Sequence, residues 1–382
     1  IRTGGYLYID KTEHVYRLVS EGSYYFLSRP RRFGKSLLLS TIKALFLGKR
    51  ELFKGLAIDQ KEDWDWAVHP VMHLDLNTEK YDKPETLYDR INLFLEENEQ
   101  IYGKREAERS LGTRFEGIIK RAYEKTGQRV VILVDEYDKP LLQAIGNKEL
   151  QDEYRGTLKG FYGALKSMDG CIKFAMLTGV TKFGKVSVFS DLNNLEDISL
   201  DYGYHDICGI TEQELLTCFS EQIGTLAQRA RMTREKCIEK LRKMYDGYHF
   251  CEDAPGMYNP FSVLSTFKKQ SFGSYWFETG TPTYLVELLR RHYYDLEEMA
   301  TSDVTSDVIN SVDAESTNPI PVIYQSGYLT IKGYDNEFQM YHLGFPNQEV
   351  EEGFIKYLAP FYLDNREQRS VFDIRSFTSD VR

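Results

Sequence analysis

The residues with the most specific chemistry lie between Arg29 and Ser36. This segment reads Arg-Pro-Arg-Arg-Phe-Gly-Lys-Ser, and its last three residues match the end of the phosphate-loop pattern G-x-x-x-x-G-K-[ST]. The ammonium of Lys35 is suited to the outer phosphates of a nucleotide, and the Ser36 hydroxyl is suited to magnesium. Arg29 stands where the pattern has its first glycine, so a plain basic loop at a helix start is the alternative interpretation.

An apolar run precedes this loop, and an amphipathic stretch follows it. Residues 24–27 predict a buried strand, and residues 37–47 predict a helix that ends at Gly48. Backbone N–H groups at a helix start point at an anion, and the helix dipole favours negative charge there. The expected nucleotide contacts are Arg31, Arg32, Phe33, Gly34, Lys35, Ser36 and Leu37.

Two carboxylates follow a second apolar run. Residues 130–134 are mostly β-branched, which is typical of a buried parallel strand, and Asp135 and Glu136 come directly after them. Carboxylates at this end of a strand face the crevice in which open α/β sheets bind ligands. We therefore expect Asp135 to hold Mg²⁺ together with Ser36, and Glu136 to polarise the attacking water. A strand that simply ends in charged turn residues before Pro140 is the alternative.

Strands and helices continue to alternate around these motifs. The candidate elements lie at residues 71–76, 84–100, 149–167 and 173–178. The alternation predicts an α/β fold with the parallel sheet of a P-loop NTPase core. In phosphate-loop ATPases with an extra acidic glutamate, the strand that ends in Thr178 lies between the other two, so Thr178 is expected to face the terminal phosphate. The alternative is that Thr178 and Thr181 are ordinary turn residues whose hydroxyls contact no ligand.

After about residue 210 the pattern changes to helices with short connectors. Thr211 and Glu214 form a capping box that opens a helix toward Gln222, and a second helix is expected over residues 233–245. Pro260 begins a further helix, as proline prefers. In some related ATPases a proline at this place contacts the adenine.

A hairpin is predicted farther along the chain. Residues 327–332 and 338–343 are strand candidates that flank Asp335-Asn336. Helix, hairpin and helix together indicate a winged-helix-like module. The expected domains are an α/β core at 1–210, a helical lid at 211–295, and the winged-helix-like module with a C-terminal tail at 296–382.

These motifs and several further segments together resemble the AAA-ATPase-like family of prokaryotic proteins over nearly the whole chain. The segments are 28–36, 131–137, 177–183, 189–197, 245–250, 258–262, 326–330 and 346–350. The resemblance implies a relation to archaeal-type and STAND ATPases, and it implies that arginine is usual at position 29. Many members continue into a C-terminal PD-(D/E)XK nuclease domain. That domain is expected to lie outside this chain, which begins at Ile1 without methionine, and Asp373 and Asp380 are expected to be solvated charges.

Net charge, cysteine spacing and the length of apolar stretches indicate which classes of partner the chain can have. The chain has 382 residues and a net charge of -10, which argues against broad nonspecific binding of DNA. Binding of DNA is therefore expected to be weak or to occur through the missing nuclease domain. A protein partner or a homo-oligomer is left open. The five cysteines lack C-x-x-C spacing, and no apolar stretch reaches membrane-spanning length, so a cytoplasmic protein without a membrane partner is expected.

The sequence therefore predicts an ATP-binding and ATP-hydrolysing molecular switch that uses ATP and Mg²⁺. Residues 29–36 would be its Walker A motif and residues 130–136 its Walker B motif, with Lys35, Glu136 and Thr178 as catalytic residues. The alternative is a nucleotide-gated or non-hydrolysing scaffold that serves a separate nuclease domain or another partner. A third hypothesis places all of the chemistry in that nuclease domain.

Overall fold

A computed structural model of the chain describes residues 1–182, 188–189, 192, 194–278, 302–310 and 318–362. Contacts between Cα atoms divide the chain into two compact units. The first unit contains residues 1–29 and 35–199, and the second contains residues 30–34 and most of the chain from Leu200 onward. Residues 30–34, here called the loop apex, thus belong to the second unit although Lys35 belongs to the first. The expected three-domain division stays a prediction, and its boundary at 295 lies outside the described residues.

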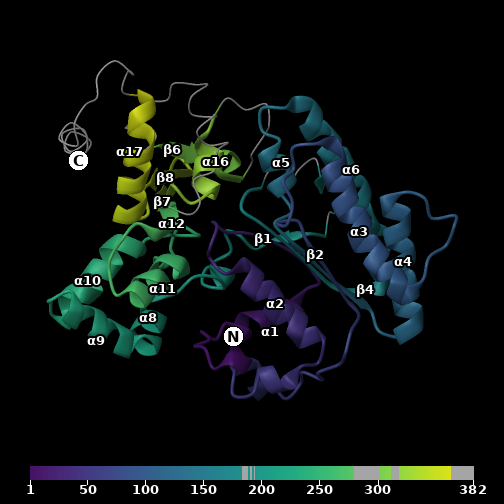
Figure 1. Cartoon of the computed structure of the whole chain (residues 1–382), viewed down its shortest axis with the longest axis horizontal. Coiled ribbons are helices and arrows are strands. Elements are labelled where there is room, and N and C mark those ends of the chain that lie inside the picture. The colour runs from purple at the N-terminus through teal and green to yellow at the C-terminus, as the bar shows by residue number, and fades with distance from the viewer. Residues whose placement is uncertain (183–187, 190–191, 193, 279–301, 311–317, 363–382) are drawn as a thin grey trace. The chain divides into compact units, whose positions relative to one another are not determined.

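A parallel sheet with the strand order β2-β3-β4-β1-β5 forms the centre of the first unit (Figure 1). All of its pairings are parallel. The expected α/β core is confirmed, and the strand that ends beyond Thr178 lies between the other two motif strands, as predicted. The strands are β1 (Tyr24–Ser28), β2 (Val71–Asp75), β3 (Val130–Asp135), β4 (Ile172–Gly179) and β5 (Glu196–Asp197).

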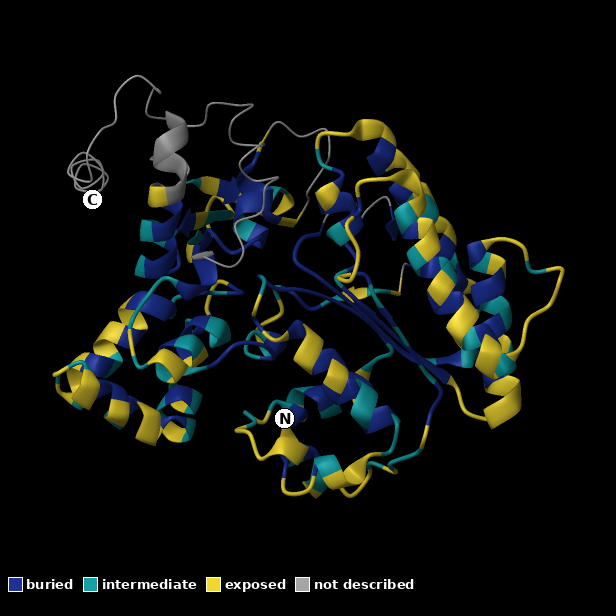
Figure 2. Cartoon of the chain, in the orientation of Figure 1, coloured by how far each residue is buried: buried dark blue, intermediate teal, exposed yellow. Residues whose placement is uncertain are grey.

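Helices cover both faces of this sheet, with α1 and α2 on one side and α3, α4 and α6 on the other (Figure 1). Every residue of β1 and β3 is buried, whereas β2, at the edge, alternates between buried and half-buried residues. Figure 2 shows the same burial as dark blue along the central strands. The helices are α1 (Thr12–Glu21), α2 (Lys35–Phe46), α3 (Pro84–Tyr102), α4 (Leu111–Thr126), α5 (Lys139–Gln143) and α6 (Lys148–Ser167).

Aromatic packing joins α3, α4 and α6. The rings of Phe115 and Phe161 are stacked with their centroids 4.5 Å apart, and Phe94 meets both rings edge-on at 5.8 and 6.2 Å. All three side chains are buried. Since offset stacking and edge-to-face contacts are the favourable geometries for aromatic rings, this cluster fixes how the three helices lie against one another.

The second unit is helical and carries a small antiparallel sheet in the order β6-β8-β7. Its strands are β6 (Asp303–Thr305), β7 (Thr330–Asp335) and β8 (Met340–Gly344). Its helices are α8 (Glu212–Cys218), α9 (Ser220–Arg229), α10 (Arg234–Tyr245), α11 (Pro260–Lys269), α12 (Tyr275–Glu278), α15 (Ser306–Asn310), α16 (Ile320–Gln325) and α17 (Gln348–Tyr362).

The helix starts predicted from capping residues are present in this unit, and one predicted helix ends earlier than expected. The capping box of Thr211 and Glu214 is present, and Thr233 and Asn259 cap α10 and α11. The helix expected to run toward Gln222 is interrupted, because Phe219 leaves the helical conformation and stacks on Phe267 at 5.3 Å. The contact of Pro260 with adenine stays a prediction.

The predicted hairpin is present as β7 and β8. The third strand, β6, was not predicted, because three residues are too few to show an alternating pattern. Assignment of this region to the winged-helix class stays a proposal.

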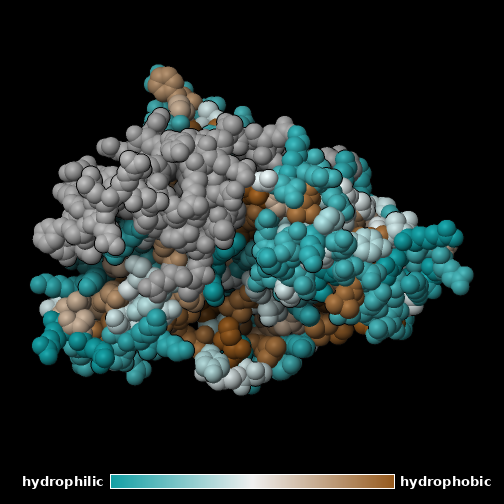
Figure 3. Space-filling model, turned by 45° about the horizontal axis from the view of Figure 1, so that its top comes forward, coloured by the Kyte–Doolittle hydropathy of each residue, from teal (hydrophilic) through white to brown (hydrophobic). Residues whose placement is uncertain are grey.

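Within the described parts of the chain, no helix combines the length and the apolar character that crossing a membrane requires. Figure 3 shows hydrophilic residues over much of the surface that is not drawn in grey, with smaller hydrophobic areas between them.

Replacing Phe161 with alanine tests the helix layer. We expect Phe161→Ala to lower the free energy of unfolding by about 3–5 kcal/mol, because it removes a buried ring from the centre of the cluster. Leu93→Ala is the control, since Leu93 lies on α3 with 48% of its surface exposed and should change stability by no more than about 0.5 kcal/mol. Urea unfolding followed by circular dichroism measures both, and equal losses for the two variants would contradict the packing described here.

Candidate functional site

The carboxyl ends of β1, β4 and β3 meet at one edge of the sheet. The strand register pairs Leu27 of β1 with Thr178, and it pairs Val134 of β3 with Leu177. Thr178 and Asp135 therefore end neighbouring strands, at the edge where parallel sheets bind ligands.

Lys35 and Glu136 are brought together at this edge. Lys35 begins α2 with only 4% of its surface exposed. Its Nζ donates a hydrogen bond to the Arg29 carbonyl at 3.0 Å and lies 3.4 Å from Oε1 of Glu136. Glu136 has a φ of 55°, a left-handed conformation that is uncommon outside glycine and concentrates at functional sites. The expected phosphate cation and the expected water-orienting carboxylate are thus ion-paired.

A buried hydrogen bond joins the other two candidates. The Thr178 hydroxyl donates to Oδ1 of Asp135 at 2.7 Å, and both side chains are buried. The bond fixes how the carboxylate is oriented. Contact between Thr178 and a phosphate stays a prediction.

The donor set fits a magnesium ion. Asp135 offers a carboxylate, and Ser36, exposed in the first turn of α2, offers a hydroxyl. Both are hard oxygen ligands, and Mg²⁺ is usually held by one or two carboxylates together with substrate phosphates rather than by a cage of protein ligands. The described residues contain no group of three or more His, Cys, Asp or Glu side chains placed to hold a metal.

Asp138 is a buried carboxylate that the sequence analysis missed. Its oxygens accept hydrogen bonds from the Val180 and Thr181 amides, and its Oδ2 accepts one from the Thr181 hydroxyl at 2.8 Å. The pKa of Asp138 is raised from 3.8 to about 6, first by burial and then by the nearby charge of Glu136, against the lowering effect of the Thr181 bonds. The signal that could have identified it is its place three residues after Asp135.

The turn after β4 has no room for a side chain at Gly179. A Cβ there would lie 2.6 Å from Oδ1 of Asp138 and 2.7 Å from the ring of Tyr137. Tyr137 also donates its hydroxyl to the Thr181 carbonyl at 3.1 Å. The ends of β3 and β4 are therefore tied to each other by buried contacts beyond the strand pairing itself.

Lys182 continues the same turn and was not predicted as a site residue. It is buried, and its Nζ lies 2.9 Å from Oδ2 of Asp197 in β5. Phe183 and Gly184, which completed the predicted turn, and Ser190, Asp191 and Asn193 of the segment at 189–197 lie outside the described residues.

Arg29 supports the structure of the loop rather than offering its charge to a ligand. Its side chain is 1% exposed and donates from Nη1 to the carbonyls of Ser28 and Ser199 at 2.9 and 2.8 Å. Arg29 is not among the residues with positive φ; within the loop these are Arg32, at 67°, and Gly34, at 103°. The missing first glycine is therefore tolerated, because left-handed backbone is needed at other positions of the loop.

Side chains of the loop apex contact other residues of the second unit. The Arg32 guanidinium lies over the Phe261 ring at 4.6 Å, and Phe33 is buried. Gly34 and Leu37 are exposed. The phosphate contacts predicted for Arg31, Arg32, Phe33, Gly34, Lys35, Ser36 and Leu37 stay predictions.

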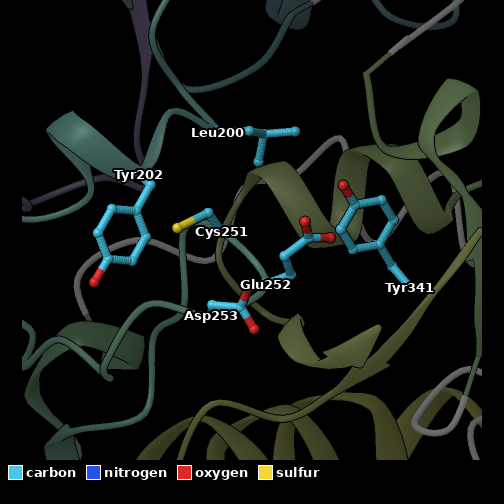
Figure 4. Close-up of a pocket in the computed structure, with 6 residues that line it drawn as sticks. All are labelled: Leu200, Tyr202, Cys251, Glu252, Asp253 and Tyr341. Carbon is cyan, nitrogen blue, oxygen red and sulfur yellow. The ribbon is translucent and has the colours of Figure 1, made fainter. Parts of the chain in front are cut away.

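A half-open pocket of about 420 Å³ lies in the second unit. Figure 4 shows two tyrosine rings on either side of the stretch at 251–253, which contributes two carboxylates. None of the six described residues that line it carries a positive charge, which the binding of a triphosphate would need. They are Leu200, Tyr202, Cys251, Glu252, Asp253 and Tyr341.

The raised pKa of Asp138 leads to a pH-dependent prediction. Because its pKa is higher in the folded chain than in the unfolded one, the folded state binds the proton more tightly, and the resulting stabilisation is present below about pH 4 and lost as the pH rises through about 6. Asp138→Asn removes this titration. Measured by urea unfolding, the stability of the wild type relative to the variant should fall between pH 4 and pH 6.5. A difference in stability between the wild type and Asp138→Asn that stays constant over this range would refute the assignment.

Two comparisons with known proteins identify the family of this chain. Residues 1–189 match a family model described as "Predicted AAA-ATPase". A protein of Azotobacter chroococcum mcd 1, described as an uncharacterized protein in the vnfD 5' region, is 39% identical over 370 residues, which cover 95% of this chain and 68% of that protein. With the matching α/β core and parallel sheet, these similarities show that the chain belongs to the AAA-ATPase-like family.

Proposed function

We propose that this chain binds ATP with Mg²⁺ and hydrolyses it as a molecular switch. The observation that carries the proposal is the 3.4 Å contact of Lys35 with Glu136, at the sheet edge where Asp135 and Thr178 are hydrogen-bonded. A cation, a metal-binding carboxylate and a second carboxylate at one edge are the groups that phosphoryl transfer to water requires. Membership of a family described as a predicted AAA-ATPase supports the nucleotide class.

Each residue of the site would have a separate role in binding ATP and Mg²⁺. The loop amides and Lys35 would bind the phosphates, because backbone N–H groups at a helix start attract an anion. Asp135 and the Ser36 hydroxyl would hold Mg²⁺, which when bound neutralises charge on the β- and γ-phosphate oxygens. Thr178 would keep the Asp135 carboxylate oriented through their 2.7 Å bond.

The ion pair between Lys35 and Glu136 indicates how binding would prepare hydrolysis. Phosphate oxygens would compete with the Glu136 carboxylate for the Lys35 ammonium. Once displaced from Lys35, Glu136 would be able to accept a hydrogen bond from a water and orient it toward the terminal phosphate. Glu136 would then change partner between the nucleotide-free and the ATP-bound protein.

The second candidate function is a nucleotide-gated or non-hydrolysing binding module. Its support is the end of the second unit, where β6 is followed by α15 and α16 and then by the β7–β8 hairpin in the sheet order β6-β8-β7. This succession fits a winged-helix-like module. Lys332 of β7 donates to the Pro346 carbonyl, and burial lowers its pKa, so a protein surface rather than DNA is the proposed partner class. A fused nuclease domain stays a proposal from the family resemblance.

Binding is tested by the thermal stability of the protein with and without Mg-ATP. ATP at about 100 times its dissociation constant should stabilise the wild type by roughly 2.7 kcal/mol, seen as a rise of several degrees in Tm. Lys35→Ala should abolish that rise, because it removes the phosphate cation. Lys43→Ala, later on the same helix, is the matched control and should keep it. A wild-type melting curve that millimolar Mg-ATP leaves unchanged would exclude ATP binding by this chain.

Hydrolysis is tested by Glu136→Gln, which keeps the shape of the side chain but removes its charge and most of its basicity. We expect the variant to bind Mg-ATP and to release phosphate at least about 100-fold more slowly, as for loss of a general base. An arginine finger from a partner can add about 10³- to 10⁵-fold, so turnover is measured over a range of protein concentrations. Equal turnover by both proteins would remove Glu136 from the mechanism, and binding without turnover in either would favour the binding module.

A further inference from the structure

The backbone of the loop apex is held by an indole. Nε1 of Trp276, in α12, donates a hydrogen bond to the carbonyl of Arg31 at 3.0 Å. A peptide unit is planar and trans, so its C=O and the N–H of the following residue point in opposite directions. A bond that fixes the Arg31 carbonyl therefore also fixes where the Arg32 amide N–H points, and that amide is one of the predicted phosphate donors.

Trp276 is itself held by a buried carboxylate. Its backbone N–H donates to Oε1 of Glu349 at 2.8 Å, and the Ser262 hydroxyl donates to Oε2 of the same residue at 2.7 Å. Glu349, near the start of α17, is fully buried. Because a buried carboxylate is costly without donors, these bonds constrain α11, α12 and α17 together.

Phe33 anchors the other end of the apex. Its ring meets the rings of Tyr248 and Phe250 edge-on, with centroids 4.8 and 5.4 Å apart. Its carbonyl accepts a hydrogen bond from the Gly209 amide at 3.1 Å. These three contacts hold the Phe33 side chain and the peptide that precedes Gly34.

The segment around Gly327 packs closely against Pro30 of the loop apex. A Cβ at this position would lie 2.6 Å from Cβ of Pro30, and its φ of 89° is itself unfavourable for other residues. The glycine lets this segment lie directly against the first residue of the apex.

We propose that Trp276 is a positioning residue for the phosphate loop, and that its link to Glu349 sets the affinity for the phosphates of the nucleotide. The inference rests on the proposed function, since the loop is taken to bind ATP. The indole N–H orients the Arg31–Arg32 peptide, and the Phe33 contacts hold the next turn, just before Lys35. Coupling between two events is reciprocal, so a bound nucleotide that strengthens this loop geometry also strengthens the hold on Trp276.

The experiment replaces the indole N–H while keeping the ring. Benzothienylalanine at position 276 puts sulfur in place of the N–H group, and Trp276→Phe is the simpler companion variant. Loss of one hydrogen bond should weaken Mg-ATP binding by about two- to tenfold. Turnover at saturating ATP should stay within about twofold of the wild type, because uniform binding is lost rather than an interaction specific to the transition state. Trp66→Phe is the matched control and should keep the wild-type affinity.

Hydrogen–deuterium exchange gives a readout that needs no nucleotide. Amides of residues 31–34 should exchange several-fold faster in the benzothienylalanine protein than in the wild type, while amides of β3 should exchange equally. Unchanged exchange at residues 31–34 would overturn the positioning role. If the Phe variant does not fold, the benzothienylalanine protein decides the question.

The two proposals fail in different ways. A wild type that does not bind Mg-ATP refutes the proposed function and, with it, the affinity claim for Trp276. A wild type that binds Mg-ATP while the benzothienylalanine protein binds it equally well refutes only the role of Trp276.

Discussion

The hydrogen bond between Thr178 and Asp135 is the interaction on which the candidate site depends. It crosses from β4 to β3 at 2.7 Å with both side chains buried, so the carboxylate is oriented without help from solvent. It can form only because β4 lies between β1 and β3 and because the three parallel strands end at one edge. The same order places Arg29, directly after β1, beside the end of β4, where its amide donates a hydrogen bond to the Gly179 carbonyl at 3.2 Å. The order of the strands therefore decides which residues can meet at this edge.

Backbone conformation at this edge explains why a degenerate phosphate motif is compatible with the fold. Left-handed φ angles occur at Arg32, Gly34 and Glu136 and not at Arg29. A side chain at position 29 therefore meets no conformational penalty, and the arginine points inward to carbonyls of Ser28 and Ser199. The Arg29 guanidinium thus supports the path of the chain after β1, whereas the Lys35 ammonium lies 3.4 Å from a carboxylate oxygen of Glu136.

The sequence predicted the parts that depend on local pattern. Apolar runs located β1, β3 and β4, and the motifs placed Lys35 at the start of a helix and Asp135 at the end of a strand, as observed. The place of Asp138 three residues after Asp135 was its one local signal; its donors, Val180 and Thr181, are more than forty residues away, and a local pattern does not reveal a distant hydrogen bond. The break at Phe219 was missed for the same reason, since a ring contact with Phe267 outweighs helix propensity there.

Two buried carboxylates each join segments that lie far apart in the sequence. Asp138 gathers donors from the turn after β4, and Glu349 gathers Ser262 and Trp276. Each carboxylate must keep its donors because a buried charge without them is unstable, so each fixes segments that the chain order alone leaves apart. The segments at 258–262, 326–330 and 346–350 supply Ser262, Gly327 and Glu349. Together they hold Trp276 and the loop apex within the second unit, so residues far along the chain shape the backbone of residues 30–34.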